Sequence, residues 1–150
     1  MEERDHVAVM QQFGRTYRAF MGAFEHYVGQ PLPRWRIMLM LNQHGGSSSQ
    51  KRLVETMRID PGALTRQLKT LEALGWIERE PDPRDNRVTN VTLTAAGRAA
   101  FEGCLPRRNA FLRKTMASLP DDALDALSGA LALLEVRVSE VGLSDEAGAP

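Results

Sequence analysis

The chain alternates between long stretches in which apolar residues recur every three or four positions and one short stretch in which they recur at every second position. The first spacing is that of a helix with one apolar face, and the second is that of a half-buried strand. Helical spacing dominates the chain before residue 76 and after residue 94, and the alternating spacing is confined to residues 76–93. The pattern predicts a mostly α-helical protein with one small β-hairpin.

The first two predicted helices span residues 5–28 and 33–43. Aromatic residues of the first helix follow one another at spacings of four, three, four and three: Phe13, Tyr17, Phe20, Phe24 and Tyr27. Gly29 and Pro31 end this helix, and a turn is predicted over residues 45–48 after the second one. The second helix has too many apolar residues for one exposed face, which predicts a central position in the fold.

Two helices joined by a short turn come next, which is the helix-turn-helix pattern. Ser49 is a candidate N-cap for a short helix over residues 50–57, and Asp60 followed by Pro61 is the clearest helix start in the chain. Gly75 is a suitable residue to end the second helix. The predicted buried stripe of that helix consists of Leu64, Leu68, Leu71 and Leu74.

A β-hairpin is predicted directly after this motif. Residues 76–80 alternate in character, residues 81–86 are polar and rich in turn formers, and residues 87–93 alternate again with many β-branched side chains. A hairpin in this position is a wing.

The last third of the chain is predicted to form two long helices. Thr94 is a candidate cap for a helix over residues 95–117, which Pro106 is expected to kink. After Pro120, apolar residues follow at spacings of three and four: Leu124, Leu127, Leu131, Leu134, Val138 and Val141. A heptad-like seam of this kind is typical of a helix that packs against a partner helix. We therefore expect a homodimer, and the residues expected to hold it together are Leu127, Leu131, Leu134 and Val138.

Composition narrows the class of protein. The 150 residues are 43% hydrophobic and 25% charged, which is ordinary for one globular domain. Cys104 is the only cysteine, so no internal disulfide can form, and apolar runs such as Ile37–Leu41 are far too short to cross a membrane. Residues 2–5 are charged and unlike a signal peptide. We expect a soluble, cytoplasmic protein.

The ionisable residues do not form the patterns that enzymes or metal sites need. His6, His26 and His44 are scattered, without a metal-ligand spacing, and no nucleophile or carboxylate pair stands in a catalytic motif. We expect no catalytic residue, no metal and no cofactor. The formal net charge of zero counts mildly against nucleic-acid binding, so the placement of the basic residues matters more than their number.

Two motifs follow the helix-turn-helix pattern within residues 59–97. The first is Asp82-Pro83-Arg84-Asp85-Asn86-Arg87, a D-x-R-D-x-R wing, and the second is Leu93-Thr94-Ala95-Ala96-Gly97, an L-T-x-x-G helix entry. This combination resembles the MarR family of winged helix-turn-helix transcriptional regulators. Pro106 and Trp76 depart from the family's usual pattern, but neither is at a position that would contact DNA.

The resemblance implies a single domain over residues 1–150. Within it, residues 33–93 would form a winged helix-turn-helix DNA-binding lobe, flanked by dimerisation helices over residues 5–28 and 95–143. The helix after Asp60 would enter the major groove with its N-terminus first.

Different residues of this lobe suit different parts of DNA. The small residues that begin the helix let its backbone approach the bases, Arg66 suits a bidentate contact with guanine, and Lys69 suits a phosphate. Arg87, or else Arg84, is expected in the minor groove, where a narrow groove attracts arginine. The expected DNA contacts are Gln50, Lys51, Pro61, Gly62, Ala63, Thr65, Arg66, Lys69, Arg84 and Arg87. The alternative for Gln50, Lys51, Arg66 and Lys69 is that they form only a solvated face.

Other residues would shape the wing or bind an effector. Asp85 is expected to hold the wing by pairing with Arg79 or Arg87. A small aromatic carboxylate is expected to bind at Arg15, Tyr17, Arg18 and Trp35, by charge and by stacking. The alternative is that the two aromatic side chains are core and that the arginines are solvated or pair across the dimer.

These expectations define one function and two alternatives. The resemblance implies a dimeric repressor that binds a palindromic operator in double-stranded DNA and is released by the effector. The first alternative is a winged-helix module for protein contact without a DNA role. The second is a metal-sensing repressor.

Overall fold

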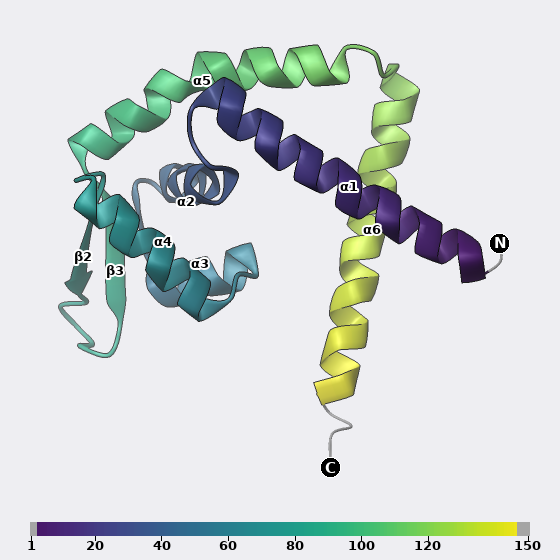
Figure 1. The fold of residues 1–150 in the computed structure, drawn as a ribbon. Coiled ribbons are helices and arrows are strands. Elements are labelled where there is room, and N and C mark those ends of the chain that lie inside the picture. The colour runs from purple at the N-terminus through teal and green to yellow at the C-terminus, as the bar shows by residue number, and fades with distance from the viewer. Residues whose placement is uncertain (1–2, 147–150) are drawn as a thin grey trace. The chain divides into compact units, whose positions relative to one another are not determined.

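The computed structural model describes residues 3–146, and within them the chain forms six helices and three strands (Figure 1). In chain order these are α1 (Glu3–Val28), α2 (Leu32–Gln43), β1 (Ser47–Ser49), α3 (Gln50–Met57), α4 (Pro61–Ala73), β2 (Ile77–Pro81), β3 (Thr89–Leu93), α5 (Ala95–Met116) and α6 (Asp121–Glu146). The predicted mostly α-helical fold with a β-hairpin wing is confirmed. Two compact units divide this chain, the first ending at Phe111 and the second beginning at Leu112.

The core of the first unit forms around α2, as its apolar density predicts. Ile37, Met38 and Leu41 are fully buried. The neighbouring elements contribute Phe24 and Val28 from α1, Leu64, Leu68 and Leu71 from α4, Ile77 from β2 and Val91 from β3. Apolar burial at these positions is the main stabilising contribution to this unit.

The three predicted helix caps are present. Ser49 Oγ accepts a hydrogen bond from the Arg52 amide at 3.1 Å, and Asp60 Oδ2 accepts one from the Ala63 amide at 3.0 Å. Thr94 Oγ1 accepts one from the Gly97 amide at 3.0 Å. Each bond satisfies an amide that the first turn of a helix leaves without a backbone partner.

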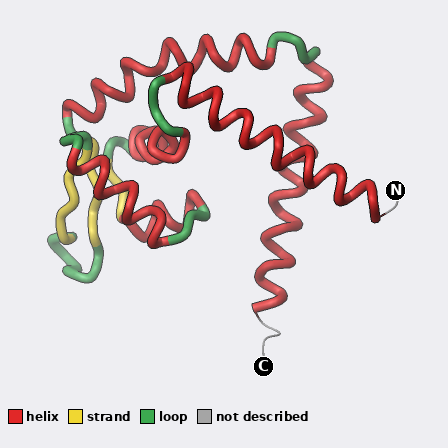
Figure 2. Tube along the Cα trace, viewed as in Figure 1, coloured by secondary structure: helices red, strands yellow, loops and turns green. Residues whose placement is uncertain are grey.

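The sheet has one strand more than the sequence predicts. Residues 45–48 are predicted as a turn, but Ser47–Ser49 forms β1, which pairs antiparallel with β3 and gives the strand order β1-β3-β2. Figure 2 shows the three strands side by side in yellow. Three consecutive serines carry no alternation of apolar and polar residues, so this strand leaves no periodic signal and depends on pairing with β3.

Two predicted apolar faces are exposed in part. Leu74 is 46% exposed because α4 ends at Ala73, and Leu74 lies beyond the part of the helix that packs on the core. On α1, Phe20 and Phe24 pack against Phe111 of α5, whereas the earlier aromatic residues of the helix are exposed. Within the aromatic stripe of α1, Phe24 is therefore buried and Phe20 half-buried, whereas Tyr27 is 36% exposed.

The second unit contains α6 and its exposed apolar side chains. Leu127, Leu131, Leu134 and Val138 are between 41% and 62% exposed. Within residues 3–146, no helix combines the length and the apolar character that crossing a bilayer requires.

Candidate nucleic-acid interface

The helix-turn-helix is held together by its own polar contacts. Arg58 ends α3 in the left-handed region, with a φ of 50°, and Asp60 caps α4 two residues later. Gln50 Nε2 on α3 donates a hydrogen bond to Thr65 Oγ1 on α4 at 3.2 Å. The Thr65 hydroxyl in turn donates to the Pro61 carbonyl at 2.9 Å. Gln50 and Thr65, two of the expected DNA contacts, therefore also fix the two helices to each other.

The outer face of α4 is open at its N-terminal end. Pro61, Gly62, Arg66 and Lys69 are exposed, and Ala63 is half-buried. A Cβ at Gly62 would lie 3.7 Å from Arg66 Nη1, so the guanidinium lies along the first turn of the helix. This arrangement combines little side-chain bulk with an exposed cation that carries five N–H donors.

The wing tip is shaped by two carboxylates. Asp82 Oδ1 accepts hydrogen bonds from the amides of Arg84 and Asp85, at 2.8 and 3.2 Å, and its Oδ2 accepts one from Asn90 Nδ2 at 2.8 Å. The Asn90 bond, followed by the Arg84 amide bond, lowers the pKa of Asp82. This role of Asp82 was not predicted from the sequence, although an aspartate before proline at a turn is a signal for such contacts.

Asp85 pairs with Arg87, one of the two partners that the sequence left open. Arg87 Nε and Nη2 donate to Asp85 Oδ1 and Oδ2 at 3.0 and 3.2 Å. This bidentate contact lowers the pKa of Asp85 and orients the guanidinium, while the Arg87 side chain stays 90% exposed. Arg84, three positions earlier in the wing tip, is also exposed.

Arg79, the other possible partner of Asp85, binds Glu72 on α4. Its Nε and Nη2 donate to Glu72 Oε2 and Oε1, both at 3.1 Å. The Arg79 hydrogen bond lowers the pKa of Glu72. Glu72 is absent from the sequence predictions because it lies seven positions from Arg79 in a different type of element, and no periodicity connects the two.

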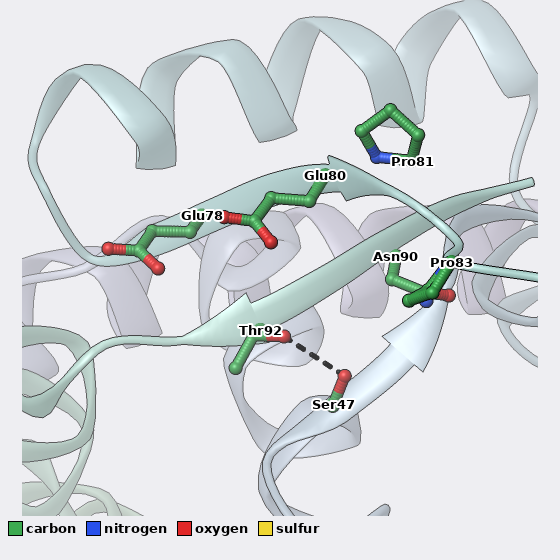
Figure 3. Close-up of a pocket in the computed structure, with 7 residues that line it drawn as sticks. All are labelled: Ser47, Glu78, Glu80, Pro81, Pro83, Asn90 and Thr92. Carbon is green, nitrogen blue, oxygen red and sulfur yellow. Dashed lines mark hydrogen bonds between the residues drawn. The ribbon is translucent and has the colours of Figure 1, made fainter. Parts of the chain in front are cut away.

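The face of the sheet opposite to Arg79 is acidic. Figure 3 shows Glu78 and Glu80 extending from β2. Both line a hollow with a volume of about 340 Å³. The residues lining this hollow are Ser47, Glu78, Glu80, Pro81, Pro83, Asn90 and Thr92. The Ser47 and Thr92 hydroxyls, drawn with a dashed line, are 3.0 Å apart. The wing thus has two exposed arginines at its tip and an acidic outer face.

The residues expected to bind an effector are not gathered at one place. Arg15 and Arg18 line an open hollow along α1 with Met10, Gln11 and Gly14. Tyr17 is exposed and stacks on Phe13, with ring centroids 6.4 Å apart.

Trp35 lies apart from the α1 hollow and is 2% exposed. Its ring stacks on Phe101 with centroids 4.6 Å apart, and the Arg108 guanidinium carbon lies 5.8 Å from its centroid. The open stacking surface predicted at Trp35 is therefore absent from this structure, because α5 covers the ring.

The remaining candidates for chemistry stay separate. Cys104 is buried, and burial raises the pKa of its thiol, which disfavours the reactive thiolate. Within the part of the chain that the structure describes, no three histidine, cysteine, aspartate or glutamate side chains lie close enough to share a metal ion.

Sequence comparisons place these features in a known family. A profile of the MarR family matches residues 31–89, which run from α2 to the start of β3. The uncharacterized HTH-type transcriptional regulator YdgJ of Bacillus subtilis is 30% identical over 118 residues, which cover 79% of this chain and 71% of YdgJ. The multiple antibiotic resistance protein MarR of Escherichia coli is 46% identical over a shorter segment of 52 residues, 35% of this chain and 36% of that protein.

Solved structures share the fold. A cysteine-to-serine mutant of MarR from E. coli, crystallised with operator DNA, superposes with a TM-score of 0.80 at 22% identity, covering 89% of this chain and 99% of the other. The ligand-free organohalide-sensing regulator RdhR-CbdbA1625 reaches a TM-score of 0.86 at 17% identity, covering 94% and 84%. At such identities the likeness concerns the fold alone, and the sequence relatives carry the assignment. The chain belongs to the MarR family of HTH-type transcriptional regulators.

Proposed function

We propose that this protein represses transcription by binding a palindromic operator in double-stranded DNA as a homodimer. The observation that carries the proposal is the placement of exposed arginines on two neighbouring elements of one unit. Arg66 lies on the open face of α4, and Arg84 and Arg87 lie at the wing tip. A helix and a wing presented together suit adjacent grooves of B-form DNA.

In this proposal α4 enters the major groove with its N-terminal turn first. Pro61, Gly62 and Ala63 let the backbone approach the base edges, and Arg66 donates two hydrogen bonds to guanine. The Thr65 hydroxyl already donates to Pro61, so it accepts from a base amino group or exchanges its internal bond for one to a phosphate.

Lysines on α4 and on α3 contact the phosphate backbone. Lys69 lies one turn beyond Arg66 on the same face, and Lys51 lies at the start of α3. Lys51 is 82% exposed, and its amino nitrogen is 4.0 Å from Glu55, so it can turn toward a phosphate at little cost. Gln50 contributes through the Thr65 contact that orients α4.

In the minor groove, Arg87 is the inserted side chain. Its contact with Asp85 is exposed and therefore weak, and it uses two of the five N–H donors of the guanidinium. Arg84 adds a second positive charge at the tip. A narrow groove strengthens the attraction of both through its negative potential.

The dimer is formed through the terminal helices. Leu127, Leu131, Leu134 and Val138 give α6 an exposed apolar seam with heptad-like spacing, and such a seam is stabilised when a second copy covers it. Residues 5–28 and 95–143 are thereby the dimerisation part of one 150-residue domain. The α4 helices of the two copies then contact half-sites about 34 Å apart, one helical turn of DNA.

A small aromatic carboxylate is proposed to release the repressor. Arg15 and Arg18 line the same hollow on α1 and provide cations for the carboxylate, and Tyr17 on that helix provides an exposed ring. Trp35 joins this site only in a conformation that uncovers its ring. An effector that favours such a conformation competes with DNA by shifting the population of dimers.

The test is a gel-shift titration of the full chain with the duplex that lies upstream of its own gene. A shuffled duplex of the same composition and length is the control. We expect the native duplex to bind at least about 1,000-fold more tightly at physiological salt, the range of specific protein–DNA recognition. Equal affinity for both duplexes would refute an operator-specific function. No affinity for either one, together with binding of a protein partner, would support the protein-contact module instead.

A further inference from the structure

An ion pair joins α4 to the wing, apart from the backbone connection between them. Arg79 on β2 makes two parallel hydrogen bonds to the Glu72 carboxylate on α4, both at 3.1 Å. A guanidinium bound in this way fixes direction as well as distance. The Arg79 side chain is 20% exposed and the Glu72 side chain 44%, so the pair is partly shielded from water.

The backbone connection between α4 and β2 is short and contains a permissive residue. It consists of residues 74–76, and Gly75 has a φ of +75°. Glycine adopts this left-handed angle without strain, and the Gly75 amide donates to the Glu72 carbonyl at 2.9 Å. The Trp76 amide donates to the Leu71 carbonyl at 3.0 Å, which secures the base of β2. Arg79 provides a further polar link to α4 along the strand.

The register of the sheet explains why Arg79 provides this link and its neighbour does not. Arg79 pairs with buried Val91, so its side chain lies on the face that packs against α4. Glu78 pairs with Thr92 and lines the hollow on the opposite face (Figure 3). Neighbouring residues of one strand point to opposite faces, so one residue binds α4 and the next cannot.

We propose that Glu72 and Arg79 are positioning residues that hold the wing at the angle to α4 at which both elements reach DNA together. This inference rests on the proposed function, in which α4 and Arg87 contact different grooves. Once α4 is seated, a wing held at the right angle adds its contact with little further loss of freedom. A wing released from Glu72 loses that advantage, whereas the contacts of α4 persist.

The experiment measures how much Arg87 contributes to binding when the link is present and when it is removed. Arg87→Ala is combined with Glu72→Gln, and affinities are measured by fluorescence anisotropy on a labelled duplex selected by the full chain from random-sequence DNA. Glu78→Gln is the matched control, because it removes a carboxylate next to Arg79 on β2 that does not contact α4. Melting curves check folding, and Glu72→Gln should melt within a few degrees of the unsubstituted chain, since pairs this exposed stabilise little.

Arg87→Ala is expected to weaken binding about tenfold in the unsubstituted chain and in Glu78→Gln, but less than about threefold in Glu72→Gln. Exchanging the two charges in one chain, Glu72→Arg with Arg79→Glu, should restore part of the tenfold effect. If the pair only stabilised the fold, Glu72→Gln would weaken binding by the same factor with Arg87 present and with Arg87 replaced by alanine. Equal Arg87→Ala factors in all backgrounds overturn the inference and leave the proposed function intact.

A measurement without DNA separates the inference from the proposed function. The Arg79 Nε–H resonance is expected to shift between the unsubstituted chain and Glu72→Gln, and to stay in place in Glu78→Gln. An unshifted resonance in Glu72→Gln would show that the pair does not form in solution, which overturns the inference alone. A selection that enriches no duplex contradicts the proposed function, and the inference falls with it.

Discussion

Replacing Gly97 by alanine should destabilise the protein because the wing and α5 meet at this residue with no space for a methyl group. A Cβ at Gly97 would overlap the Trp76 carbonyl oxygen and lie 2.8 Å from the carbonyl carbon and 3.0 Å from Cα of the same residue. Carbon atoms in proteins normally approach to about 3.5–4.0 Å. All three atoms belong to the backbone, so no side-chain rotation relieves the overlap.

The overlap also falls on a group of local hydrogen bonds. The Trp76 carbonyl accepts from the Thr94 amide at 3.0 Å, and Thr94 Oγ1 both donates to Gly75 and accepts from the Gly97 amide. Overpacking costs about 1–3 kcal/mol, and a weakened hydrogen bond costs about 1 kcal/mol more. Alanine's better helix propensity offsets up to about 1 kcal/mol. We expect a net loss of about 1–4 kcal/mol, or a melting temperature lower by about 2–16 °C for a chain of this size.

The assay is thermal unfolding followed by circular dichroism, with all variants at one protein concentration. Gly103→Ala is the matched control, because Gly103 lies in the same helix and a Cβ there would meet nothing within 4 Å. The control should melt slightly above the unsubstituted chain, by the gain of about 0.5–1 kcal/mol expected for alanine in a helix. A Gly97→Ala variant that melts at or above the unsubstituted chain would refute the steric argument.

Four further outcomes are expected. Arg66→Ala should weaken operator binding by about 1–3 kcal/mol and reduce discrimination against random DNA, and unchanged discrimination would exclude a base contact. Lys69→Ala should weaken binding to all DNA sequences alike and reduce the slope of log affinity against log salt concentration by about one. Leu131→Glu should convert a dimer into a monomer in light scattering at micromolar concentration, and a monomeric unsubstituted chain would contradict the dimer. In calorimetry, operator DNA should lower the affinity of the protein for benzoate about 5- to 150-fold, as reciprocal coupling requires, and Arg18→Ala should also lower the affinity for benzoate. Equal benzoate affinity with and without DNA would remove the allosteric claim. The pKa of Asp82 is lowered in the folded chain. The contribution of this carboxylate to stability is therefore complete above its ordinary pKa and is lost as the pH falls through the lower folded value. The melting temperature should decline in acid, and less steeply in Asp82→Asn.

Much of the first unit could be predicted from local sequence. The caps at Ser49, Asp60 and Thr94 were identified because a short polar side chain before an apolar-periodic run satisfies amides within three residues of itself. The wing was identified because β-branched alternation and a turn-rich tip are also local signals. The placement of Arg66 on an exposed face followed from helical spacing alone.

Contacts between elements could not be predicted in this way. The partner of Arg79 depends on the angle at which β2 passes α4, and sequence alone left two candidates for Asp85. The openness of Trp35 depends on whether another helix covers it, and Phe101 of α5 does so. Apolar spacing shows which side of a helix is apolar but not what lies against it.

Residues a few positions apart were enough to specify the order and type of the elements, the helix caps and the basic positions of the helix-turn-helix and the wing. Packing between elements was needed to establish that β1 joins the sheet, that Glu72 holds Arg79, and that Gly97 lies against the backbone of Trp76. These contacts join residues that fold into different elements. Their distances depend on how the elements pack, and local spacing carries no record of that packing.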